Sequence, residues 1–320
     1  MPTEERARDA TAAVIRYAAF TDKPTGGNPA GVVLDASALG DSDRLAIARR
    51  LGYSETAFLS RRHGGEAGEY DVRYFSPQAE VPFCGHATIA AAVAIAERDG
   101  PGQLVFHVAA GAVPVVTRRG EAGAVTASLT SITPSVADLP ATDVDAALSA
   151  LRWRRPELDA SLPPKIAYAG ARHLILAAGS RERLARLDYD FEALRAFMLS
   201  RDLTTVDLVF PAGDGLYHAR NPFPVGGVYE DPATGAAAAA FGAYLRELGR
   251  VAPPARVTVR QGDDMGRPSR IIVGIPRGDG PITVTGGAVP IGQLSSSQPS
   301  DRGLRLSGGC RWITNPWCPT

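Results

Sequence analysis

Hydrophobic positions fall mainly into short runs that are separated by Pro, Gly and polar residues. Residues 12–33 predict a strand, a Pro/Gly turn and a second strand that begins at Ala30. A helix is predicted at 42–51, with Ser42 as its cap and Gly52 as its end. Further short strands are predicted at 53–60 and throughout 103–129. The first part of the chain should therefore be rich in strands.

An alanine-rich helix is predicted at 86–98. Its sequence "ATIAAAVAIA" is apolar on nearly every face, so the helix should be buried on every face. For one helix among many strands, this indicates a sheet curled around it.

The second half repeats this plan with another alanine-rich helix in 233–247. Strands are predicted before and after it, and surface helices are predicted at 143–152 and 181–201. The repeat suggests a degenerate internal duplication. The predicted class is α+β, with an N-terminal lobe at 12–130, a C-terminal lobe at 131–282 and a cleft between them. A tail at 295–320 is expected to be disordered or poorly packed.

Composition narrows the possible partners. The 34 basic and 34 acidic side chains balance to a formal net charge of +0, so the basic surface of a nucleic-acid-binding protein is not expected. No run of about 18 apolar residues predicts a membrane span, and the N-terminus lacks a signal-peptide core. We expect a cytoplasmic protein that binds a small, anionic or neutral molecule.

The starts of the two alanine-rich helices are candidate binding sites for an anion. Unpaired N–H groups in the first turn carry partial positive charge, and Gly85 and Gly235 allow a ligand to approach the backbone. Two such ends facing each other could hold a carboxylate or an enolate-like oxyanion.

Three side chains could then handle a proton. Glu55 precedes an apolar strand and could serve as a general acid/base or be an exposed strand-end residue. His86 could carry a proton, donate to substrate in its neutral form, or cap the helix. Asp231 could be catalytic, a helix cap, or both. A nucleophilic pair of Cys84 and His86 is disfavoured, because residues two apart do not share a helix face, although the first residues could lie outside the helix. The sequence also contains no G-x-S-x-G or cysteine-hydrolase signature.

Five ordered motifs resemble the PhzF-like family, the phenazine-biosynthesis isomerases, which is related in fold to diaminopimelate epimerase. The motifs are "GNPAGVVL" (27–34), "SETAFL" (54–59), "RYFSPQAEVPFCGHAT" (73–88), "EDPATGAA" (230–237) and "RQGDDMGRPSRIIV" (260–273). The resemblance covers about residues 14–293.

The resemblance implies two pseudo-symmetric lobes, each a curved mixed β-sheet wrapped around a central α-helix. A strand near 283–293 would complete the first lobe. The resemblance also implies no metal or organic cofactor, and a homodimer. It assigns acid/base chemistry to Glu55, and catalytic roles to His86 and Asp231.

The resemblance also bears on substrate binding, which it implies for Asn28, Cys84, Gly85, Gly235 and Ala236. In the related epimerases, a cysteine at each helix start acts on one face of a carbon centre. Cys84 resembles the first of these, but "EDPATG" has no second thiol. Many relatives have a serine that contacts substrate where this chain has Ala236.

The expected function is a cofactor-independent isomerase that moves a proton and a double bond in a small unsaturated carboxylic or amino acid. Secondary metabolism, such as antibiotic biosynthesis, is the expected setting. Two alternatives are open: an amino-acid racemase or epimerase, and a non-catalytic protein of the same fold that binds a small molecule.

Overall fold

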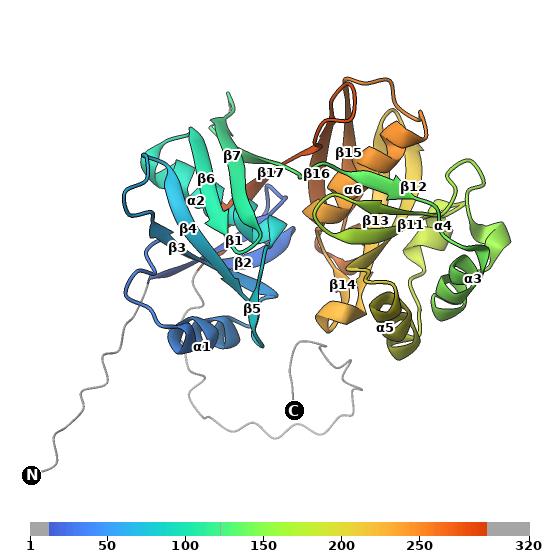
Figure 1. Cartoon of the computed structure of the whole chain (residues 1–320), viewed down its shortest axis with the longest axis horizontal. Coiled ribbons are helices and arrows are strands. Elements are labelled where there is room, and N and C mark those ends of the chain that lie inside the picture. Colours follow the sequence, from blue (N-terminus) through green and yellow to red (C-terminus); the bar gives the residue numbers. More distant parts are fainter. Residues whose placement is uncertain (1–12, 122, 293–320) are drawn as a thin grey trace, which may run out of the picture.

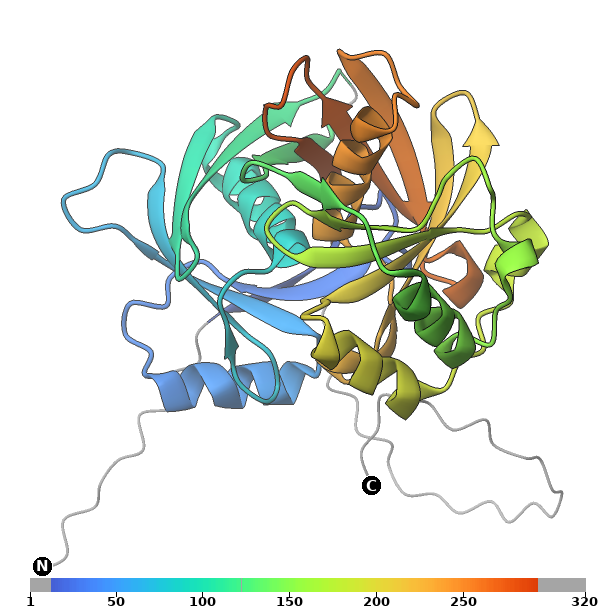
Figure 2. The same cartoon turned by 45° about the vertical axis from the view of Figure 1, so that its right-hand side comes forward.

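The computed structural model describes residues 13–121 and 123–292. The predicted tail at 295–320 lies outside these residues. Figure 1 shows the strands in two groups, one around helix α2 (Gly85–Asp99) and one around helix α6 (Gly235–Glu247). Figure 2 shows the same two groups after rotation. The predicted mixture of helices and strands in an α+β fold is confirmed.

The strands around α2 form a closed circuit. They pair in the order β1, β2, β3, β4, β6, β7 and β8, and β17 pairs with both β8 and β1. Their bounds are β1 (Val14–Ala19), β2 (Asn28–Val33), β3 (Glu55–Arg61), β4 (Glu69–Phe75), β6 (Gln103–Val108), β7 (Gly111–Arg119), β8 (Val125–Thr130) and β17 (Thr283–Pro290).

The strands near α6 repeat this arrangement. From β10 to β17 successive pairings are antiparallel, parallel, antiparallel, parallel, antiparallel and antiparallel. From β1 to β8 the pairings follow the same series. The bounds are β9 (Ser135–Ala137), β10 (Lys165–Tyr168), β11 (Arg172–Ala177), β12 (Thr205–Gly213), β13 (Leu216–Phe223), β15 (Ala255–Gln261) and β16 (Ser269–Ile275).

This repeated topology agrees with the internal duplication inferred from the sequence. A short strand precedes the central helix in each half: β5 (Glu80–Val81) before α2, and β14 (Val228–Asp231) before α6. Both helices begin four residues after the last residue of that strand. Residues of the two halves can therefore be compared position by position, whereas the division into lobes at residues 130 and 282 stays a prediction.

Helix α2 is buried as its sequence predicts. Every residue from His86 to Ala96 is buried, and the helix contacts β1, β2, β3, β7, β8 and β17. Its alanine side chains let the surrounding strands approach from all sides, so the sheet can close around a single helix.

Two helix predictions need correction. Helix α1 (Asp41–Leu51) starts after Gly40, and Ser42 does not cap it; instead, the Asp43 carboxylate accepts a hydrogen bond from the Gly40 N–H at 3.0 Å. The predicted end at Gly52 is confirmed by its left-handed backbone.

The predicted helix at 181–201 is also wrong, because it is divided into α4 (Arg181–Ala185) and α5 (Phe191–Ser200). Asp190 starts the second helix by accepting a hydrogen bond from the Ala193 N–H at 2.9 Å.

The remaining helical elements are short. They are α3 (Ala141–Ala150), where a helix at 143–152 is predicted, and the 3₁₀ helices η1 (Arg155–Glu157), η2 (Pro224–Gly226) and η3 (Asp263–Met265). None of the helices in 13–121 and 123–292 is long and apolar enough to cross a membrane.

Candidate active site

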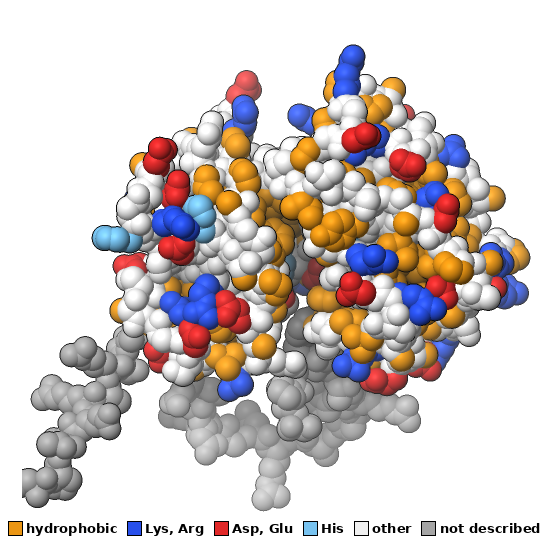
Figure 3. All heavy atoms as spheres, in the orientation of Figure 1, with side chains coloured by type: hydrophobic (Ala, Val, Ile, Leu, Met, Phe, Trp, Pro, Cys, Tyr) orange, Lys and Arg blue, Asp and Glu red, His pale blue; other side chains and the backbone are white. Residues whose placement is uncertain are grey.

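The two central helices begin close to each other, and the predicted site residues gather there. Cys84 is the N-cap of α2 and Thr234 is the N-cap of α6. Neither side chain caps its own helix with a hydrogen bond, which leaves both free for other contacts. Figure 3 shows that the surface is hollowed between the two groups of strands, with hydrophobic side chains gathered along the groove.

Asn28 connects the two helix starts. It is the first residue of β2, two residues earlier than the predicted strand start, and is 1% exposed. Its amide nitrogen lies 2.8 Å from Asp231 Oδ1, 3.1 Å from the Ala233 carbonyl oxygen and 3.2 Å from His86 Nδ1. The predicted contact of Asn28 with substrate is untested, but its amide nitrogen is already engaged within the protein.

These contacts favour one proton position on His86. The Asn28 amide nitrogen cannot accept a hydrogen bond, but its two N–H groups face three acceptors, and Asp231 and Ala233 are nearer than His86 Nδ1. Nδ1 can only accept in this contact, which favours the neutral ring with its proton on Nε2. That nitrogen lies 3.3 Å from Ser54 Oγ and 3.5 Å from Glu55 Oε2. Burial lowers the pKa of His86, and the negative charge of Glu55 only partly opposes this. His86 is therefore neutral near pH 7, as its place at a helix start predicts.

Glu55 faces the site from the start of β3. Its side chain is 16% exposed, so it is not the exposed strand-end residue that was one interpretation of the sequence. Its Oε2 accepts a hydrogen bond from the Cys84 thiol at 3.5 Å. A carboxylate that is mostly buried but still reaches solvent is well placed to exchange a proton with a bound molecule.

Cys84 lines the site as a thiol. It has extended backbone and so lies outside the helix, which lets its Sγ come within 3.4 Å of His86 Nδ1. The helix-face argument therefore does not apply to this pair, because Cys84 precedes the helix. Burial, followed by the charge of Glu55, raises the pKa of Cys84 well above its ordinary value. A nucleophilic thiolate is disfavoured for this reason.

Asp231 ends β14 and reaches toward Asn28 and Thr234. Its Oδ2 accepts a hydrogen bond from Thr234 Oγ1 at 2.5 Å, so Asp231 is not itself the helix cap. Burial raises the pKa of Asp231 to about 7, against the opposing hydrogen bonds from Thr234 and Asn28. This carboxyl group therefore changes its protonation near neutral pH.

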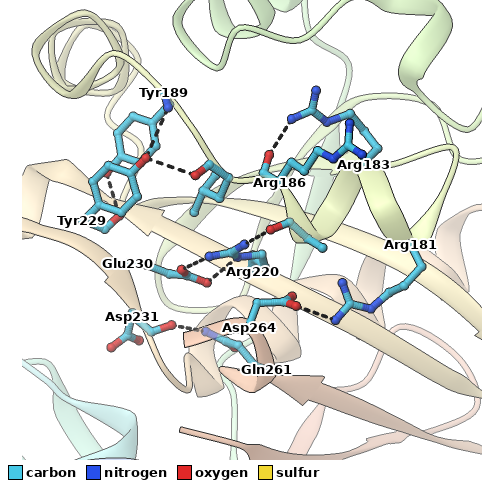
Figure 4. Close-up of polar contacts among 12 residues, drawn as sticks. Arg181, Arg183, Arg186, Tyr189, Arg220, Tyr229, Glu230, Asp231, Gln261 and Asp264 are labelled. Atoms are coloured by element: carbon cyan, nitrogen blue, oxygen red, sulfur yellow. Dashed lines mark hydrogen bonds and ion pairs between the residues drawn. The ribbon is translucent and has the colours of Figure 1, made fainter. Parts of the chain in front are cut away.

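A buried ion pair lies beside Asp231. Arg220 donates two hydrogen bonds to the Glu230 carboxylate, from Nε at 2.9 Å and from Nη2 at 2.5 Å, as Figure 4 shows. The charge of Glu230, although paired with Arg220, still contributes to the raised pKa of Asp231, after burial and the charge of Glu55.

The two helix-start glycines differ in their surroundings. A Cβ atom on Gly85 would meet only Phe83, at 4.0 Å, whereas one on Gly235 would lie 3.2 Å from the buried Phe20 ring. The backbone at Gly85 is thus open to a ligand, while Gly235 is packed from behind. Ala236 is partly exposed. Contact of these residues with substrate stays a prediction.

Glu55, Cys84 and His86 offer one metal-ligand atom each, all within 4.8 Å. Zinc accepts this ligand set. In the structure these three side chains contact one another and their polar neighbours: Cys84 Sγ lies 3.4 Å from Nδ1 of His86 and donates to Glu55, and the ring of His86 also contacts Asn28 and Ser54.

Three contributing residues were missed in the sequence. Ser54 contacts His86, and Thr234 and Gln261 contact Asp231. All three lie within or beside the recognised motifs, but polar residues that bond to other polar residues leave no periodic pattern. Counterpart positions would have identified Thr234, because it occupies in the second half the place of Cys84 in the first.

Comparisons with known proteins identify the family of this chain. The family model described as phenazine biosynthesis-like protein matches residues 17–293. The trans-2,3-dihydro-3-hydroxyanthranilate isomerase of Pseudomonas fluorescens is 31% identical, over 78% of this chain and 86% of that protein.

Solved structures show the same fold. A PhzF-family phenazine biosynthesis protein from Bacillus anthracis superposes with a TM-score of 0.78 at 26% identity, covering 88% of this chain and 98% of that one. A hydroxyproline epimerase from Agrobacterium vitis shares the fold at a TM-score of 0.60 and 14% identity, over 87% and 91% of the two chains. On the extent of the family match and the identity to the Pseudomonas isomerase, the chain belongs to the phenazine biosynthesis-like (PhzF) family.

Proposed function

We propose that this protein is an isomerase that moves a proton, and with it a double bond, within a small unsaturated carboxylic or amino acid. The observation that carries the proposal is the asymmetry of the site. A carboxylate suited to proton transfer, Glu55, lies beside one helix start. The other helix start has Thr234 in place of a second thiol.

The reaction needs one base that later acts as the acid. The Glu55 carboxylate removes a proton from a carbon adjacent to the unsaturated system, and the electron pair of the broken C–H bond delocalises toward the carboxyl group. The protonated Glu55 then returns the proton to another carbon on the same face, and the double bond shifts.

The other residues stabilise and orient the charged intermediate. The Nε2–H of neutral His86 and the carboxyl group of Asp231, which is protonated below about pH 7, can each donate a hydrogen bond. Backbone N–H groups of the first turns of α2 and α6 provide an anion site for the substrate carboxylate. This transfer requires no group beyond the protein itself.

Proton NMR in D2O tests the proposal. The first compound is trans-2,3-dihydro-3-hydroxyanthranilate, on which the Pseudomonas relatives are named to act, followed by other small unsaturated acids and amino acids. The expected result is deuterium entering a carbon position as the double bond migrates, with wild-type protein but not with Glu55→Gln. Inversion at an α carbon without migration would instead identify an epimerase. Tight binding without any exchange would identify a binding protein.

A further inference from the structure

The fifth recognised motif has no role in the chemistry above, yet it contacts both sides of the site. Residues 261–269 run from the end of β15 through η3 to the start of β16. Figure 4 shows Gln261 reaching Asp231 from this segment. The contacts fall into two sets, one toward the start of α6 and one toward the turn before Asn28.

The first set holds the residues before α6. Gln261 Nε2 donates to the Asp231 carbonyl oxygen at 2.7 Å and to Thr234 Oγ1 at 3.0 Å, and its Oε1 accepts from the Thr234 N–H at 3.1 Å. Ser269 Oγ donates to the Pro232 carbonyl oxygen at 2.8 Å. Gln261 and Ser269 are 1% and 3% exposed, so water cannot readily replace these bonds.

The second set holds the turn that leads into β2. Arg267 donates from Nε to the Gly27 carbonyl oxygen at 2.8 Å and from Nη2 to the Gly26 carbonyl oxygen at 2.9 Å. The Gly27 N–H in turn donates to the Pro268 carbonyl oxygen at 3.0 Å. Among the described residues, no carboxylate forms an ion pair with Arg267, so both of these donors serve the backbone next to Asn28.

The segment also has close contacts of its own. Gly262 has φ of +76°, and a Cβ atom there would lie 2.3 Å from the Arg267 carbonyl oxygen and 2.8 Å from that of Pro232. Only glycine allows this close approach. Asp264 accepts a hydrogen bond from Arg181 of α4 at 2.9 Å, which anchors the exposed middle of the segment (Figure 4).

We propose that residues 261–269 form a positioning strap that fixes the relative placement of the two halves of the site, with Arg267 holding Asn28, and Gln261 and Ser269 holding Asp231. The strap touches none of the reacting atoms. It acts through Asn28, whose amide joins Asp231 to His86. A displacement of about 1 Å at a catalytic group can cost about 100-fold in rate, so this placement matters for the proposed isomerisation, on which the catalytic part of the inference rests.

The test uses histidine labelled with ¹⁵N, a readout that needs no substrate. The His86 signal is assigned by its loss in His86→Gln. In wild-type protein the Nε2–H tautomer should predominate. In Arg267→Ala the released turn should let Asn28 move, and a mixture of tautomers should appear.

Arg270→Ala is the matched control, because Arg270 is an exposed arginine three residues further along and should leave the tautomer unchanged. Arg267→Lys should rescue partly, since an ammonium group lacks the forked geometry that spans two carbonyl groups. With a substrate in hand, Arg267→Ala should lower kcat about tenfold and change KM less than about twofold.

Ser269→Ala separates the two contact sets. It should alter the titration of Asp231, followed by carboxyl ¹³C NMR, and leave the His86 tautomer as in wild type. If Arg267→Ala does not fold, the His86 tautomer is measured in Arg267→Lys and the Asp231 titration in Ser269→Ala instead. A folded Arg267 variant with the wild-type His86 tautomer, or an unaltered Asp231 titration in Ser269→Ala, would contradict the proposed positioning role of residues 261–269. Failure of all compounds to turn over would overturn the proposed function and leave these measurements valid.

Discussion

The starts of α2 and α6 have the same backbone design and different chemistry. Each follows a short strand and an N-cap whose side chain does not cap its own helix. At the first start the cap and the second helical residue are Cys84 and His86, and at the second they are Thr234 and Ala236. One end therefore presents a thiol and an imidazole, and the other a hydroxyl and a methyl group.

The strands beside these helices differ in the same way. Glu55 begins β3, and its counterpart at the start of β12 is Thr205. Thr205 is buried, bonded to His173 at 2.8 Å and to Asn221 at 2.6 Å, and has no proton to exchange near neutral pH. The comparison shows that the two halves keep the same backbone plan while titratable side chains stand at these equivalent places in only one of them, which is why the proposed acid/base chemistry is assigned to the first half.

The largest expected effect comes from removing the proton carrier. Glu55→Gln keeps the shape of the side chain but cannot accept a proton, so exchange of substrate hydrogen with D2O should fall about 1000-fold. Glu80→Gln is the control, since Glu80 lies on the surface and pairs with Arg73, and it should keep the wild-type rate. NMR exchange rates measure both. Full activity in Glu55→Gln would contradict the proposal that the first half carries the acid/base chemistry.

The second-largest effect is expected from Asp231, the proposed proton donor in the second half. Asp231→Asn should slow turnover about 100-fold, because a positioned proton donor contributes a rate of that order. Because burial raises the pKa of Asp231 to about 7, the wild-type rate should fall as pH rises through about 7, where the carboxyl group loses its proton. Asparagine does not titrate, so this decline should vanish in a pH profile of kcat/KM, which reports the pKa values of the free enzyme. A decline that persists unchanged would assign it to another group.

A smaller effect, on stability, concerns a buried acid that the first half lacks. Asp207 lies two residues after Thr205, where β3 has Ala57, and accepts a hydrogen bond from Asn221 at 2.9 Å. Burial raises the pKa of Asp207 to about 7. Between about pH 4 and 7 the folded state binds a proton that the unfolded state does not, so stability contributed by Asp207 is lost as pH rises.

Asp207→Asn keeps the acceptor oxygen and removes this loss. Its free energy of unfolding should exceed that of the wild type by on the order of 2–4 kcal/mol at pH 8, with the gap closing toward pH 4. Urea denaturation at the two pH values measures it. A difference independent of pH would show that Asp207 does not titrate differently in the folded state.

The smallest effect comes from the helix-start residue that departs from many relatives. Ala236→Ser adds a hydroxyl group to the proposed anion site at the start of α6, and one new hydrogen bond to a carboxylate should lower KM about three- to tenfold. Steady-state kinetics with a substrate and with its amide would show whether the new hydroxyl group contacts the substrate carboxylate. Equal changes for both compounds would place the hydroxyl group away from the carboxylate.

The fold could be predicted where burial of an element leaves a pattern of hydrophobic residues in the sequence. The alanine-rich helix that is apolar on every face predicted the strands around α2, and the repeat of that plan predicted α6. The break at 186–190 was missed, because the apolar spacing of 181–201 continues across it while Asp190 caps a new helix.

The candidate residues of the site could be predicted, but their contacts could not. Glu55, His86 and Asp231 were chosen by chemistry and resemblance, and Asn28 and Cys84 by resemblance; the structure brings all five together. The bridging role of Asn28 and the contacts of Gln261, Arg267 and Ser269 could not be predicted, because these side chains bond to backbone carbonyl groups or to residues far away in the sequence. Such partners depend on the folded arrangement and leave no local pattern.

The central claim, that one carboxylate removes a proton and returns it on the same face, has a direct test. A substrate found by the D2O screen is labelled with deuterium at the carbon that loses its proton, and converted in H2O with enzyme in excess. The account predicts that part of the label reappears at the new carbon of the product, detected by ²H NMR, and that this transfer disappears in Glu55→Gln. Complete loss of label to solvent together with inversion at the original carbon would contradict it and indicate two groups acting on opposite faces.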